Sequence, residues 1–281
     1  MNISIIGLGL IGGSLAVALK NKGFASHIIG VDNNPQHTAL AELSGMVDET
    51  DVLDSAVDRC DLIILATPVD VIKEQLPAIL DRIGGTKKVV TDMGSTKGSI
   101  GRLVEKHPNR HHYVASHPMA GTEHSGPLAA TGKLFDHKCA IICDSEKSAP
   151  FALKIAEKMY AALNMELIRM DAREHDISAA YVSHISHISS FALSLCVLEK
   201  EKNEKRLLSL AGGGFTSTVR LAKSSAEMWS PVFEQNESNV LEVIDTYIEK
   251  LQQFKTCIAN KDTNGVSKLI REANEIGKII S

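Results

Sequence analysis

The sequence predicts an α/β fold with a doubly wound sheet in residues 1–170, followed by an all-helical domain in residues 171–281. Short apolar runs alternate with amphipathic stretches in the first part, which is typical of a parallel sheet covered by helices on both faces. A glycine-rich turn at residues 7–12 follows the first of these runs. After Asp171 the strand-like runs stop, and stretches with helical periodicity continue to the end.

The apolar runs in the first part are expected to form the strands of the sheet. Each run is short, rich in Val, Ile and Leu, and separated from the next by a helical stretch or a turn. The helical part carries three consecutive glycines at 212–214, which are expected to interrupt any helix. The expected strands are residues 3–6, 28–31, 62–66, 89–91, 113–115, 140–143 and 166–170.

Composition limits the classes of partner. The chain has 281 residues and a formal net charge of -4, which argues against a nucleic acid or an anionic membrane as the main partner and favours a small-molecule substrate. Its five scattered cysteines form no Cys-x-x-Cys pair, and the first strand begins at once, so we expect reduced thiols and a cytoplasmic protein. Residues 177–198 are apolar, but they include histidines and serines, so we expect a helix buried between other helices.

A dinucleotide-binding motif is present at the start of the chain. The sequence Gly7-Leu8-Gly9-Leu10-Ile11-Gly12 follows the first expected strand and precedes a helical stretch. In that setting the first glycine permits a tight turn, the second lets the backbone approach a pyrophosphate, and the third lets the helix pack on the strand. The N–H groups at the start of the helix are available to phosphates. These features predict a Rossmann-type nucleotide domain.

The choice of cofactor is indicated by the end of the second strand. Asp32 lies about 20 residues after the motif, where a carboxylate accepts hydrogen bonds from the ribose hydroxyls. The next residues, 33–35, include no arginine for a 2′-phosphate, so NAD is favoured over NADP. A loop after the strand at 62–66 is expected to flank the adenosine or pyrophosphate. The expected cofactor-binding residues are Gly7, Leu8, Gly9, Leu10, Ile11, Gly12, Asp32, Thr67, Pro68 and Ser95.

Two later loops, at residues 91–98 and 116–123, follow strands at the carboxyl edge of the sheet, where ligands of open α/β folds bind. His117 stands before a proline that fixes the turn, and it is expected to face the nicotinamide. A neutral imidazole can accept a hydroxyl proton near neutral pH, so His117 is the expected catalytic base. Ser95 is expected to hydrogen-bond the other ring nitrogen and set the tautomer.

Several segments together carry a resemblance to a known family. They are Gly-Leu-Gly-Leu-Ile-Gly-Gly-Ser at 7–14, Asp-Met-Gly-Ser-Thr-Lys-Gly at 92–98, His-Pro-Met-Ala-Gly-Thr-Glu at 117–123, His-Ile-Ser-His at 184–187, and Gly-Gly-Gly-Phe-Thr-Ser-Thr-Val-Arg-Leu-Ala-Lys-Ser at 212–224. These segments occur in the same order in the prephenate dehydrogenase family, which the chain therefore resembles. The resemblance spans nearly the whole sequence.

This resemblance implies oxidative decarboxylation of prephenate to 4-hydroxyphenylpyruvate, with hydride transfer to NAD, in tyrosine biosynthesis. It implies that His117 contacts the 4-hydroxyl with Ser95 in support, that His187 helps bind the substrate, and that Arg220 holds a substrate carboxylate. A guanidinium suits that role because it grips a carboxylate with two hydrogen bonds. Two further residues are expected at the mouth of the substrate site, Thr122 and Glu123.

The resemblance also implies a homodimer formed through the helical domain, which is rich in amphipathic stretches that need a partner. Trp229 is implied to approach the active site of the partner subunit. The segment 216–218 lacks the acidic residue that the family often has before the arginine, so we expect no ion pair from that segment. His184 and His187 share a helix face, but no third ligand follows at a suitable spacing, so we expect no metal.

Three other functions are considered. Arogenate dehydrogenase differs only in the amino group of its substrate, and the presence of His187 favours prephenate. A β-hydroxyacid dehydrogenase would carry a Lys-x-x-x-Asn motif, which this sequence does not contain. A catalytically silent NAD-binding dimer is disfavoured because Ser95, His117, His187 and Arg220 are all present.

Overall fold

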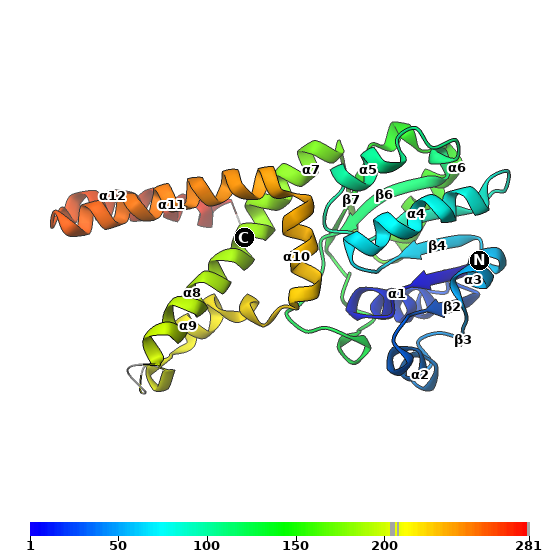
Figure 1. The fold of residues 1–281 in the computed structure, drawn as a ribbon, viewed down its shortest axis with the longest axis horizontal. Coiled ribbons are helices and arrows are strands. Elements are labelled where there is room, and N and C mark those ends of the chain that lie inside the picture. The colour runs from blue at the N-terminus through cyan, green and yellow to red at the C-terminus, as the bar shows by residue number, and fades with distance from the viewer. Residues whose placement is uncertain (203–205, 207, 280–281) are drawn as a thin grey trace. The chain divides into compact units, whose positions relative to one another are not determined.

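The computed structural model describes residues 1–202, 206 and 208–279. The chain divides into two compact units, Met1–Asn236 and Glu237–Ser281. The first unit is built on an eight-stranded sheet with the order β3-β2-β1-β4-β5-β6-β7-β8 (Figure 1). The strands are β1 (Asn2–Ile6), β2 (His27–Val31), β3 (Glu49–Thr50), β4 (Leu62–Leu65), β5 (Val89–Asp92), β6 (Tyr113–Pro118), β7 (Cys139–Cys143) and β8 (Glu166–Met170).

All seven predicted strands are confirmed, and the two-residue β3 was missed because it is too short to carry an apolar pattern. Strands β1 to β6 are parallel to their neighbours, whereas β7 runs antiparallel to β6 and β8 runs parallel to β7. The expectation of a wholly parallel sheet is therefore wrong at this edge. The segment between β6 and β7 contains only a short 3-10 turn, Pro127–Ala129, rather than the crossover helix that a parallel connection requires.

Helices cover both faces of the sheet, and a buried apolar cluster fills each interface. The strands are apolar on both sides because neither face is left to water. On one face lie α1 (Leu10–Asn21), α2 (Pro35–Leu43) and α6 (Pro150–Ala162); on the other lie α3 (Leu53–Arg59), α4 (Val69–Ile83) and α5 (Gly98–Val104).

The described residues after Met170 contain helices and turns and no strand, as predicted. The expectation that the glycines at 212–214 interrupt any helix is wrong in part, since Gly212 caps the N-terminus of α9 and the other two lie inside it. The first unit contains α7 (Ala172–Ala179), a π-helical turn (Ala180–His184), α8 (Ile185–Glu201), α9 (Gly213–Thr218) and α10 (Ala226–Gln235), and the second contains α11 (Glu237–Ala259) and α12 (Thr263–Asn274).

The helical segment Ala172–Glu201 is, among the described residues, the one helix long and apolar enough to cross a membrane. Only 11% of its most apolar window is buried, and Ser190 is the buried residue of α8. Within this single chain the segment is therefore not buried between other helices, contrary to the expectation. Leu195 and Leu198 on α8 remain exposed to solvent.

The turn between β1 and α1 depends on two glycines. Gly7 has a φ of +94°, and a Cβ there would lie 2.7 Å from the carbonyl oxygen of Ala66. At Gly12 a Cβ would lie 1.8 Å from the carbonyl oxygen of Gly7, so the helix packs on the turn only without a side chain. A Cβ at Gly9 would meet nothing within 4 Å. The turn is therefore closed at its base and open at its tip.

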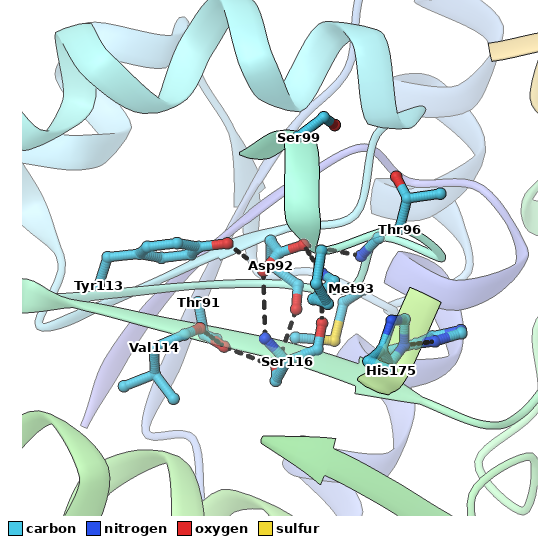
Figure 2. A network of polar contacts seen from close by, with 12 residues as sticks. Thr91, Asp92, Met93, Thr96, Ser99, Tyr113, Val114, Ser116 and His175 are labelled. Carbon is cyan, nitrogen blue, oxygen red and sulfur yellow. Dashed lines mark hydrogen bonds and ion pairs between the residues drawn. The ribbon is translucent and has the colours of Figure 1, made fainter. Parts of the chain in front are cut away.

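A buried ion pair lies between Asp92 at the end of β5 and Lys97 in the segment after it, and Figure 2 shows Asp92 with its partners Tyr113 and Ser116 on β6. Lys97 and Asp92 are fully buried and in contact, and the ammonium group of Lys97 also donates to the carbonyl oxygen of Ser116 at 2.8 Å. Asp92 accepts further hydrogen bonds from the hydroxyl of Tyr113 at 2.6 Å and from the N–H of Ser116 at 3.2 Å. Because both charges have several partners, the cost of burying them is offset.

The glycine turn yields a test of stability. Gly12→Ala should lower the thermal midpoint by about 4–8 °C, because a clash with backbone costs about 2 kcal/mol and each kcal/mol shifts the midpoint of such a domain by about 2–4 °C. Gly9→Ala is the matched control, and its midpoint should stay close to that of the unmodified protein. Equal losses in the two variants, measured by calorimetry, would contradict this account of the turn.

The ion pair yields a second test. Lys97→Met leaves Asp92 buried without its cation and should cost about 3–5 kcal/mol in the free energy of unfolding, measured in urea. The double variant Lys97→Met/Asp92→Asn should lose less than the sum of the two single variants. Lys268→Met, in the exposed Lys268–Glu272 pair, is the control and should show no measurable change. Additive losses at 92 and 97 would exclude coupling between the two side chains.

Candidate functional site

A cavity of about 530 Å³ lies at the carboxyl ends of β1, β4, β5 and β6. These strands are parallel, so the segments that follow them meet at one edge of the sheet. Side chains from the helical part of the first unit complete the wall: Val182, Ser183, His187, Arg220, Leu221, Ser224, Ser225, Met228, Trp229 and Val232. The expected site residues that line it are Gly9, Leu10, Ile11, Thr67, Pro68, Ser95, His117, Thr122, Glu123, His187, Arg220 and Trp229; Gly7, Leu8, Gly12 and Asp32 do not line it.

One part of the cavity fits a dinucleotide. Gly9 opens onto free space and is the N-cap of α1 without a side-chain hydrogen bond, so the first N–H groups of the helix have no side-chain cap. Asp32 lies just after β2, where its Oδ2 accepts from the N–H of Leu8 at 2.8 Å and its Oδ1 accepts from the N–H of Asn34 at 2.8 Å. Nδ1 of His37 also lies 3.3 Å from Oδ2. These contacts hold the carboxylate in place and leave Oδ1 a lone pair for a ribose.

His117 lies near the end of β6 and lines the cavity. Its Nδ1 lies 2.9 Å from Nε2 of His175 on α7. Burial lowers the pKa of the His117 imidazole well below its ordinary value, and three nearby groups lower it further: His175, Lys97 and His184. The ring is therefore neutral near pH 7, with one nitrogen engaged by the protein.

His175 takes the place that we expected for Ser95, because it is the residue that holds the second ring nitrogen of His117. Ser95 lines the same cavity from the segment after β5. His175 is itself fully buried, and its Nδ1 lies 2.9 Å from Oδ1 of Asp176. The sequence reading missed both residues. The available signal was a His-Asp pair in a helix that directly follows a strand.

Arg220 is ion-paired across the cavity wall. Its Nη1 donates to Oε2 of Glu123 at 2.5 Å. The guanidinium is half-exposed, whereas the carboxylate is mostly covered. Hydrogen bonds from its own backbone N–H and from Arg220 lower the pKa of the Glu123 carboxyl. The acidic partner that segment 216–218 lacks thus comes from the loop after β6.

His187 and Trp229 form an aromatic part of the wall. Nδ1 of His187 donates to the carbonyl oxygen of Ser183 at 3.1 Å, and the ring centroids of His187 and Trp229 are 3.6 Å apart. Burial is the main cause that lowers the pKa of His187, and the charge of Arg220 adds to it. Trp229, which the resemblance implied at the partner's site, lines the cavity of its own chain.

His184 does not line the cavity, although it is close in sequence to His187. It is buried, its Nδ1 lies 3.2 Å from the side-chain nitrogen of Asn236, and burial lowers its pKa to about 4. Within the described residues no group of three His, Cys, Asp or Glu side chains is placed to hold a metal.

Comparison with known proteins identifies the family. The family model described as prephenate dehydrogenase, nucleotide-binding domain, matches residues 15–169, and the one described as prephenate dehydrogenase, dimerization domain, matches residues 171–272. The prephenate dehydrogenase of Bacillus subtilis (strain 168) is 29% identical over 97% of this chain and 74% of its own length. That of Lactococcus lactis subsp. cremoris (strain MG1363) is 31% identical over 98% of this chain and 78% of its own length.

A solved structure agrees with these relatives. The crystal structure of prephenate dehydrogenase from A. aeolicus, in complex with hydroxyphenyl propionate and NAD+, superposes with a TM-score of 0.88 at 28% sequence identity. The match covers 100% of this chain and 98% of that one. Both halves of the chain match the family models, the named relatives and the fold agree, and the chain belongs to the prephenate dehydrogenase family.

Proposed function

We propose that this protein oxidises and decarboxylates prephenate to 4-hydroxyphenylpyruvate in tyrosine biosynthesis, with NAD as the hydride acceptor. The observation that carries the proposal is that one cavity contains the open tip of the glycine turn, a buried neutral histidine at 117 and the guanidinium of Arg220. The names of the relatives, and the NAD+ bound in the A. aeolicus structure, support the same reaction.

His117 is the proposed catalytic residue. Its Nε2 accepts the proton of the 4-hydroxyl, so that the O–H bond breaks while the ring carbon gives up its hydride and the oxygen becomes a carbonyl. The carboxylate on the ring then leaves as carbon dioxide, and its electron pair enters the ring. The phenolic oxygen takes the proton back from Nε2, so no net proton is released. Aromatisation drives the sequence, and bound NAD supplies the hydride-accepting carbon.

Arg220 is proposed to hold a carboxylate of the substrate. In the structure it is paired with Glu123, so an incoming carboxylate shares or replaces that partner. His187 has its Nε2 left for the substrate because Nδ1 already donates to Ser183. Thr122 and Trp229 are proposed to shape the same end of the site. Ser95 is proposed to act beside His117 and the nicotinamide.

The cofactor is proposed to lie along the glycine turn, with its pyrophosphate at Gly9 and the start of α1. Asp32 is proposed to accept from the adenosine ribose and to disfavour the 2′-phosphate of NADP by repulsion. The remaining cofactor contacts are proposed for Gly7, Leu8, Leu10, Ile11, Gly12, Thr67 and Pro68.

We propose that the protein is a cytoplasmic homodimer, with a Rossmann domain at 1–170 and a helical domain at 171–281 that forms the subunit contact. The match to a dimerization domain at 171–272 and the exposed apolar residues of α8 support this arrangement. In such a dimer the partner covers the apolar side of Ala172–Glu201, and neither a membrane nor a nucleic acid is required.

The direct test is steady-state turnover with prephenate or arogenate, each with NAD or NADP. The highest kcat/KM is expected for prephenate with NAD. A higher kcat/KM for arogenate would reassign the substrate, and a lack of turnover with both would refute the dehydrogenase.

The role of His117 predicts a defect in turnover and a particular pH profile. His117→Asn should lower kcat by about 10²- to 10⁴-fold with little change in NAD affinity. Because the base must be neutral and its pKa lies well below 6.5, kcat/KM of the unmodified enzyme should stay near its maximum at pH 6.5 and fall only at lower pH. An acid limb centred at or above pH 6.5 would rule out this buried imidazole as the base.

The role of Arg220 predicts a defect in binding. Arg220→Gln should raise KM for prephenate by about 10- to 100-fold, the effect of losing hydrogen bonds from a charged group. Lys223→Gln is the control, since it removes a cation from the same 3-10 turn, Arg220–Lys223, without touching the cavity. An unchanged KM in Arg220→Gln would place the carboxylate elsewhere.

A further inference from the structure

Two buried side chains stand behind the proposed base and are not themselves part of the cavity wall. His175 lies between His117 and Asp176, with a nitrogen 2.9 Å from the ring of His117 and the other 2.9 Å from the carboxylate of Asp176. His175 is fully buried and Asp176 is nearly so. The three residues form a continuous hydrogen-bonded chain that ends at the cavity.

Asp176 is the buried end of this hydrogen-bonded series, and its protonation state determines where the protons of the two histidines lie. Oδ1 of Asp176 accepts the N–H of Lys97 at 2.8 Å, and Oδ2 accepts the N–H of Gly98 at 2.8 Å. Burial raises the pKa of the Asp176 carboxyl, but the hydrogen bonds from His175 and from these N–H groups outweigh it and leave the pKa below the ordinary value. Asp176 is therefore an ionised acceptor.

The ionised Asp176 determines which nitrogens of His175 and His117 carry a hydrogen. Nδ1 of His175 faces a carboxylate and must carry a hydrogen, so in the neutral ring Nε2 is a bare acceptor. Nδ1 of His117 faces that acceptor and must donate to it. We infer that Asp176 and His175 fix the tautomer of His117, so that its Nε2 faces the substrate as an unprotonated acceptor. They are positioning residues, because they act only through His117.

The same chain stabilises the charge that forms during the reaction. When Nε2 takes the hydroxyl proton, His117 becomes an imidazolium, and its Nδ1–H bond to His175 strengthens while the Asp176 carboxylate opposes the charge. No proton has to pass to Asp176. The other charged or titratable groups around His117 are Lys97, whose ammonium is neutralised by Asp92, and His184. Asp176 is thus the carboxylate that opposes the charge on His117 through His175.

The tautomer can be read directly by ¹⁵N NMR of histidine-labelled protein, with and without NAD. Both His117 and His175 should appear as Nδ1–H tautomers, and the signals can be assigned by their loss in His117→Asn and His175→Gln. An Nε2–H tautomer at His117 would overturn the inference. That the 4-hydroxyl of prephenate gives its proton to His117 rests on the proposed function, whereas the measured tautomer does not depend on it. Failure to turn over prephenate with the expected tautomers would refute only the function.

Substitutions of His175 and Asp176 test whether their hydrogen bonds to His117 are needed for turnover. His175→Leu should lower kcat about 10²-fold and leave the KM for NAD unchanged, and His175→Gln should recover part of the loss, because its side-chain oxygen can accept from His117. Asp176→Leu removes the acceptor of the His175 Nδ1–H and should lower kcat by a similar factor or more. Normal kcat in His175→Leu or Asp176→Leu would overturn the positioning role.

A buried histidine outside the chain provides the control. His112 is buried, and its Nδ1 lies 2.8 Å from the carbonyl oxygen of Lys88. His112→Gln should leave kcat and the tautomer of His117 unchanged, even if the thermal midpoint falls. A loss of kcat in His112→Gln equal to that of His175→Gln would attribute the defects to general destabilisation and overturn the inference.

Discussion

The site depends on the ammonium group of Lys97, which is held between the carboxylate of Asp92 and the carbonyl of Ser116. This contact ties the end of β5 to the end of β6, next to His117. The backbone N–H of the same lysine binds Asp176, so the segment after β5 also anchors α7. A buried cation is costly unless it is fully paired, and here the pairing fixes the relative positions of three elements.

The two ends of the cavity differ in how they are built. The nucleotide end is formed by backbone, where missing side chains leave room at Gly9 and forbid one at Gly12. The substrate end is formed by side chains from separate elements, such as Glu123 and Arg220, which lie 97 residues apart in the sequence. Binding a common nucleotide cofactor requires only a backbone surface of the kind at the glycine turn. Recognising one particular substrate carboxylate requires charged side chains held in fixed positions.

The sequence was sufficient for features that local pattern determines. The strands follow from apolar runs, and the glycine turn follows from spacing. The reversal of β7 was not predictable, because strand direction depends on the path of the chain between strands. His175 was missed because its partner on β6 is 58 residues away, and no spacing rule connects them. The exposure of α8 was missed because apolar composition alone does not say which molecule covers a helix.

The π-helical turn at Ala180–His184 sets the rotational phase of the helix that runs through the site. His175 and His187 are twelve positions apart, and at about 100° per residue a regular α-helix would point them about 120° away from each other. A π-turn absorbs one extra residue, which reduces the offset to about 20°. One side of the helix therefore serves both the base and the substrate wall, and inserting one further residue between them without a second π-turn would separate the two roles.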